Sequence, residues 1–71
     1  MKNKYIFNGI IDLTMPGDRI NIDDYEVEAT SLKQAKYILA IDLAQQRGLQ
    51  RYYLFERIKR SKLNVRELKG G

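Results

Sequence analysis

The sequence predicts an α+β fold: a three-stranded antiparallel sheet with one or two helices packed on one face. Three observations predict it. Residues 4–13 and 20–30 alternate between apolar and polar side chains on either side of a Pro-Gly turn. Residues 32–47 have a capped helical pattern, and 63–68 alternate again. Because domains rarely split below about 100 residues, we expect one domain over 1–71.

The first strand, 4–13, is expected to be central or covered on both faces. Ile6 and Ile10 lie on the face opposite the main apolar set. The core-facing positions are Tyr5, Phe7, Gly9, Ile11 and Leu13. Gly9 interrupts the strand, which indicates a bulge or the close approach of another element.

The second strand, 20–30, follows a turn for which Pro16-Gly17 suits the centre. Its apolar residues change phase: Ile20 and Ile22 have one parity, while Tyr25, Val27 and Ala29 have the other. A bulge at Asp23-Asp24 would bring both sets to the same face. The opposite face then carries Asp24, Glu26 and Glu28, which we interpret as solvated.

The helix over 32–47 has the clearest boundaries. Ser31 and Gln34 have the spacing of a capping box, in which Ser31 accepts from the Gln34 amide and the Gln34 side chain returns to Ser31. Gly48 suits the left-handed position after the last turn.

Two apolar stripes run along this helix. The stripe expected to lie on the hairpin is Leu32, Ala35, Ile38, Leu39 and Leu43. The second stripe is Tyr37, Ala40, Ile41 and Ala44. Either the C-terminal segment or another copy of the chain must cover the second stripe.

Residues 49–60 fit either a helix or a strand, and the helix is preferred. The aromatic residues in this segment favour a strand by propensity, whereas Leu54 and Ile58 are spaced as on a helix. A closing strand over 63–68 would pair with the hairpin, and Lys69-Gly70-Gly71 would form a frayed tail.

The composition argues against an enzyme. Without Cys or His, the chain has no zinc-finger site, thiol nucleophile or imidazole base. Neither a GxGxxG nor a GxxxxGK[ST] phosphate-binding motif is present, and the carboxylates do not converge. We therefore expect no catalytic site, no metal and no cofactor.

Charge is distributed unevenly. Residues 1–30 hold three cations and six anions, a net −3, whereas residues 31–71 hold ten cations and three anions, a net +7. Basic side chains attract phosphates and exposed aromatic rings stack on bases. The candidate nucleic-acid or partner-binding residues are Arg47, Arg51, Tyr52, Tyr53, Arg57, Lys59, Arg60 and Lys62. For Tyr52, Tyr53 and Phe55 we favour the alternative that they belong to the core.

The N-terminus lacks the continuous apolar run of a signal peptide, and no segment approaches the roughly 20 apolar residues of a membrane span. We therefore expect a cytoplasmic protein without a membrane partner.

A resemblance adds a functional class. Val27-Glu28-Ala29-Thr30, leading into Ser31 and Ala35, resembles the strand-to-helix junction of small phage and mobile-element proteins. The resemblance implies the class of host-takeover proteins and anti-CRISPR inhibitors, and transfers no site residues.

Together these observations predict a small non-enzymatic binding protein, encoded by a phage or mobile element. It would act on a host nucleoprotein or nucleic acid through its basic half, for example as an inhibitor of a CRISPR effector. The alternative is a structural homodimer or phage assembly protein whose interface is Tyr37, Ile41 and Ala44.

Overall fold

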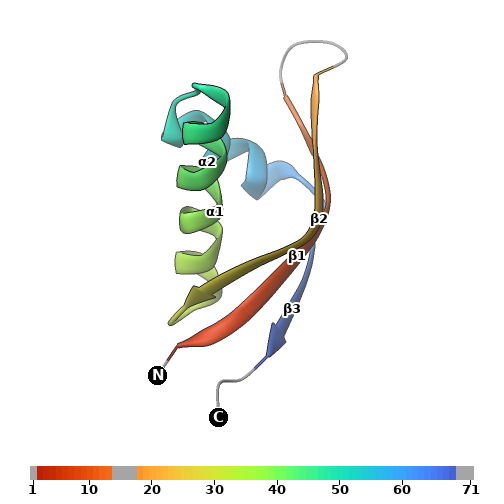
Figure 1. The fold of residues 1–71 in the computed structure, drawn as a ribbon. Helices are drawn as coiled ribbons and strands as arrows, with labels where there is room; N and C mark the ends of the chain where they lie inside the picture. The colour runs from red at the N-terminus through yellow and green to blue at the C-terminus, as the bar shows by residue number, and fades with distance from the viewer. Residues whose placement is uncertain (1, 14–17, 69–71) are drawn as a thin grey trace.

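A computed structural model describes residues 2–13 and 18–68 of the chain. Its elements follow the order β1 (Asn3–Asp12), β2 (Arg19–Ala29), α1 (Leu32–Arg47), α2 (Arg51–Arg60) and β3 (Asn64–Leu68). The strands form one antiparallel sheet in the order β2-β1-β3, and both helices lie on the same side of it (Figure 1). The predicted α+β fold is confirmed. The predicted Pro16-Gly17 turn and the 69–71 tail lie outside the described residues.

Strand β1 is the centre of the sheet, as one reading of its two apolar faces predicted. It pairs with β2 along one edge and with β3 along the other. Tyr5, Phe7 and Ile11 point to the helix side and are buried. On the opposite face Ile6 is also buried, whereas Ile10 is 45% exposed.

The predicted bulge in β2 is confirmed. Phe7 pairs with Tyr25 and Gly9 pairs with Ile22, so Asn8 stands opposite both Asp23 and Asp24. Asp24 adopts a positive φ of 46°, and its backbone N–H donates to Asn8 Oδ1 at 2.8 Å. The extra residue corrects the phase of β2, so that its apolar side chains on both sides of the bulge face the core.

Helix α1 begins and ends where the sequence predicts, with one different contact. Ser31 Oγ accepts from the backbone N–H of Gln34 at 3.1 Å, and Gly48 adopts a φ of 67°. The Gln34 side chain does not return to Ser31. Its Oε1 instead accepts from the backbone N–H of Thr30 at 2.7 Å and from the Thr30 hydroxyl at 2.8 Å. The Gln34 side chain is long enough to accept from the backbone N–H of Thr30, one residue before Ser31.

The two predicted stripes of α1 merge into one broad buried face. Its buried residues are Ala35, Leu39, Ala40, Leu43 and Ala44. Helix α2 packs against α1, so the C-terminal segment covers much of the second stripe, as one of the two alternatives predicted. The expected placement of Leu32 on the hairpin is wrong, because Leu32 is 38% exposed at the first helical turn.

Residues 51–60 form helix α2, as preferred from the sequence. Leu54 and Ile58 lie one turn apart and are 0% and 1% exposed. Tyr53 and Phe55 are half-buried and pack against the core. The core placement of Tyr52 is wrong: it is 77% exposed, because helical periodicity turns it away from Leu54 and Ile58.

Neither described helix is long and apolar enough to cross a membrane.

Candidate polyanion-binding surface

The predicted basic residues do not form one surface. Three of them, Arg57, Arg60 and Lys62, line a concave pocket of about 460 Å³ between β1 and the end of α2. We call this the β1–α2 pocket, and its remaining lining residues are Gly9, Ile10, Asp12 and Ser61. The other predicted basic residues lie elsewhere around the two helices.

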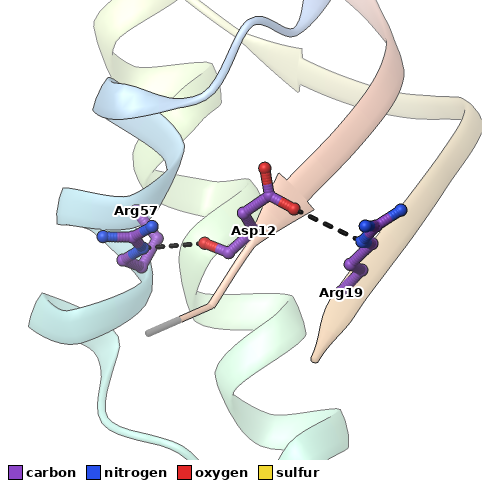
Figure 2. A network of polar contacts seen from close by, with 3 residues as sticks. All are labelled: Asp12, Arg19 and Arg57. Carbon is purple, nitrogen blue, oxygen red and sulfur yellow. Dashed lines mark hydrogen bonds and ion pairs between the residues drawn. The ribbon is translucent and has the colours of Figure 1, made fainter. Parts of the chain in front are cut away.

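Arg57 is held in position at this pocket. Its Nε donates to the backbone oxygen of Asp12 at 2.7 Å, which ties α2 to the end of β1 (Figure 2). The hydroxyl of Ser61 donates to the backbone oxygen of Arg57 at 2.6 Å and closes the last turn of α2. The guanidinium is therefore oriented before any ligand arrives.

The described ion pairs do not join the Asp12 carboxylate to Arg57. Its carboxylate is turned toward Arg19, and Oδ1 lies 3.7 Å from Arg19 Nε (Figure 2). The contact to Arg57 uses only the neutral backbone carbonyl. Asp12 is the one acidic side chain among the described lining residues, and it already has a cationic partner.

Within the described residues, the three cations of the β1–α2 pocket form no ion pair. The ion pairs found among residues 2–13 and 18–68 involve Lys4, Arg19, Lys59 and Arg66 as their cations. Arg60 and Lys62 are exposed, and Arg57 is half-buried. The described lining of the pocket therefore carries more positive than negative side chains.

Close packing at Gly9 sets the position of Lys62. A Cβ at Gly9 would lie 2.9 Å from Leu63 Cδ2 and 3.3 Å from the Lys62 backbone oxygen. Gly9 also has a φ of 141°, a conformation that other residues rarely adopt. The segment after α2 can therefore pass close to β1, as predicted from Gly9, and this segment carries Lys62, which lines the pocket together with Arg60.

The predicted residue Lys59 lies on the other flank of α2. Its Nζ is 3.4 Å from Glu56 Oε1 and 5.2 Å from the centre of the Phe55 ring. It lines a separate groove with residues of α1, including Lys33 and Lys36, which the sequence reasoning missed. A signal was present: two lysines three residues apart on a helix whose first turn has no acidic residue.

Arg47 and Arg51 lie near the α1–α2 turn. Arg47 lines a hollow that also contains Asp18 and Arg19, and Arg51 lines another beside Ile41. Neither contributes to the β1–α2 pocket. Of the two predicted tyrosines, Tyr52 is exposed on α2 and Tyr53 is half-buried against the core.

The residues suggested for a homodimer interface have different exposures. Tyr37 is 39% exposed, and its ring meets Phe55 edge-on at 5.8 Å. Ile41 is half-buried, whereas Ala44 is 4% exposed inside the chain's own core. Ala44 therefore offers little surface to a second copy, and the dimer remains a prediction.

In the part of the chain that the structure describes, no group of three or more acidic side chains could hold a metal ion.

The chain was compared with protein-family models, curated proteins and solved structures. None of the three comparisons found a match.

Proposed function

We propose that the chain is a small binding protein, not an enzyme, and that it binds the phosphate backbone of a nucleic acid through the β1–α2 pocket. The observation that carries the proposal is the convergence of Arg57, Arg60 and Lys62 on one concave surface without an acidic partner among the described residues. Such a surface neutralises phosphates and releases their counterions.

Phosphate chemistry suits the side chains at this pocket. Arg57 presents a guanidinium fixed by its bond to Asp12, and guanidinium groups bind phosphate oxygens in two-point contacts. Arg60 and Lys62 are exposed and can adjust to neighbouring phosphates. Contacts of this kind position a backbone and carry no base sequence information, so we expect binding with little sequence preference.

The resemblance to small phage proteins supports a more specific form of the proposal. In that form the bound nucleic acid belongs to a host nucleoprotein, such as the guide or target strand of a CRISPR effector, and binding inhibits it.

The test is fluorescence anisotropy with labelled single-stranded and double-stranded oligonucleotides at several salt concentrations. We expect affinity to fall with salt, with a log–log slope of about −2 to −3 for three phosphate contacts. The double variant Arg60→Gln/Lys62→Gln should reduce the magnitude of that slope by about 2.

The matched control is Arg47→Gln/Arg51→Gln, which removes the same charge away from the β1–α2 pocket. It should retain most of the affinity and most of the salt slope. Equal losses in both double variants would show that binding follows net charge and not this pocket, and absence of oligonucleotide binding at low salt would refute the proposal.

A further inference from the structure

A second concave surface lies between the two helices, apart from the β1–α2 pocket. It has a volume of about 380 Å³ and is lined by Leu32, Lys33, Lys36, Phe55 and Lys59. We call it the α1–α2 groove. Its described lining residues are all different from those of the β1–α2 pocket, so a ligand of either site contacts its own set of side chains.

The floor of the α1–α2 groove is apolar. Leu32 is 38% exposed, although it belongs to the apolar pattern of α1. Phe55 is half-buried, and the edge-on contact with Tyr37, at an interplanar angle of 85°, fixes its ring. Aliphatic and aromatic carbon exposed together in a hollow favours an apolar side chain as ligand.

The rim of the α1–α2 groove is cationic on two sides. Lys33 and Lys36 come from α1, and Lys59 comes from α2. None of the described lining residues is acidic. Lys59 meets Glu56 at the surface, whereas Lys33 and Lys36 are absent from the ion pairs of the described residues.

The start of α1 adds to the positive electrostatic potential of the α1–α2 groove. No acidic residue occupies its first turn, where the helix dipole favours negative charge. Lys33 lies in this first turn, where a cation is least favoured. A bound carboxylate would compensate for its charge.

We propose that the α1–α2 groove binds an acidic peptide segment of a partner protein, with a leucine or phenylalanine side chain as its anchor. The anchor packs on Leu32 and Phe55, and carboxylates on either side of it pair with Lys33, Lys36 and Lys59. This is the arrangement by which amphipathic segments occupy a groove between helices. Charge complementarity selects an acidic partner, and the exposed aliphatic surface of Leu32 favours an apolar side chain beside the acidic ones.

The probe is a fluorescein-labelled hexapeptide, EELFEE, titrated with the full chain and followed by anisotropy. Two further peptides separate the contributions: EESSEE keeps the charge without the anchor, and KKLFKK reverses the charge. We expect EELFEE to bind saturably, EESSEE to bind about tenfold more weakly, and KKLFKK not to bind.

Two variants locate the binding site. Lys33→Gln/Lys36→Gln should weaken EELFEE binding about three- to tenfold. Leu32→Ser should weaken it while circular dichroism stays unchanged, since Leu32 lies outside the core. The charge-matched control, Arg60→Gln/Lys62→Gln, removes two cations from the β1–α2 pocket and should retain EELFEE affinity.

Four results would overturn the proposal: no binding of EELFEE, equal binding of EESSEE, tight binding of KKLFKK, or an equal loss in the control variant. A second copy is the competing occupant, because β2 carries Asp23, Asp24, Glu26 and Glu28 as exposed acids. If light scattering shows a dimer that Lys33→Gln/Lys36→Gln converts to a monomer, the groove belongs to that second copy and the peptide proposal fails.

Discussion

At the scale of single residues, Gly9 has two independent reasons to be glycine. Its φ of 141° strains any other residue, and the space where a Cβ would stand is filled by Leu63 and the Lys62 carbonyl. One residue therefore serves both the sheet and the crossing segment that carries Lys62.

We predict that Gly9→Ala lowers the free energy of unfolding by about 2–4 kcal/mol, from backbone strain and overpacking together. Urea denaturation measures this. Gly48→Ala is the matched control, since Gly48 has a φ of 67° but nothing lies within 4 Å of a Cβ there. Gly48→Ala should lower the free energy of unfolding by only about 1 kcal/mol. Similar losses in the two variants would contradict the steric part of the explanation.

The same scale shows where sequence reasoning succeeds and fails. The bulge at Asp23-Asp24 and the close approach at Gly9 were predictable, because a change of parity and a glycine within a strand each have few physical causes. The partner of the Gln34 side chain was not predictable, because the backbone N–H groups of Thr30 and Ser31 are neighbours in the chain and the glutamine side chain is flexible. Choosing between them requires the local backbone geometry.

At the scale of elements, one side-chain contact joins β2 to α1. The hydroxyl of Tyr25 donates to Asp42 Oδ2 at 3.0 Å. Burial, and then the hydrogen bond and negative charge of Asp42, raise the pKa of Tyr25 above the ordinary tyrosine value.

This raised pKa predicts a pH dependence of stability. Above about pH 10 the unfolded chain loses the Tyr25 proton while the folded chain keeps it. The contribution of Tyr25 to the free energy of unfolding is therefore fully present below about pH 10, and it is lost as the pH rises through the pKa of Tyr25 in the folded chain. In urea denaturation between about pH 8 and 11, the free energy of unfolding should fall less with rising pH in Tyr25→Phe than in the parent chain. The exposed Tyr52→Phe is the control and should follow the parent curve.

Elements differed in how well the sequence specified them. Helix α1 has a capping serine and a terminal glycine, so its bounds were predictable. Helix α2 has no side-chain cap hydrogen bond at Gln50, and its aromatic residues favour a strand. Its helical state depends on burying Leu54 and Ile58 together, which is a tertiary effect.

At the scale of the whole molecule, stability should be unequal across the sheet. Strand β1 is paired along both edges over 4–7, whereas β3 is a five-residue edge strand in which only Val65 is half-buried and the rest are exposed. Edge elements with little buried surface detach before the core unfolds.

We predict that amide hydrogen exchange, followed by NMR, is faster over 64–68 than over 4–7. The slowest amides should lie in β1 and in the buried part of α1, where exchange requires global unfolding. Equal protection of β3 and β1 would show that the sheet opens as a single cooperative unit.

The candidate site was less predictable than the fold at this scale. Neighbours in sequence along 47–62 looked like one basic surface, but a helix distributes successive side chains around its axis. Arg57 and Lys59 consequently face different hollows, and Lys59 joins Lys33 and Lys36 from a helix distant in sequence. Such a grouping depends on how α2 crosses α1, which the pattern of residues alone does not specify.

The bulge opposite Asn8 also bears on which changes of length the chain tolerates. The bulge adds one residue to β2, and this residue keeps the apolar side chains on both sides of it facing the core. Deleting Asp23 or Asp24 would therefore remove the bulge and put the two halves of β2 out of phase. Ile20 and Ile22 would then either turn outward to water or give up their backbone partners on β1. A deletion of a single exposed aspartate would thus cost more than many substitutions of buried residues, and relatives of this chain should vary in length elsewhere.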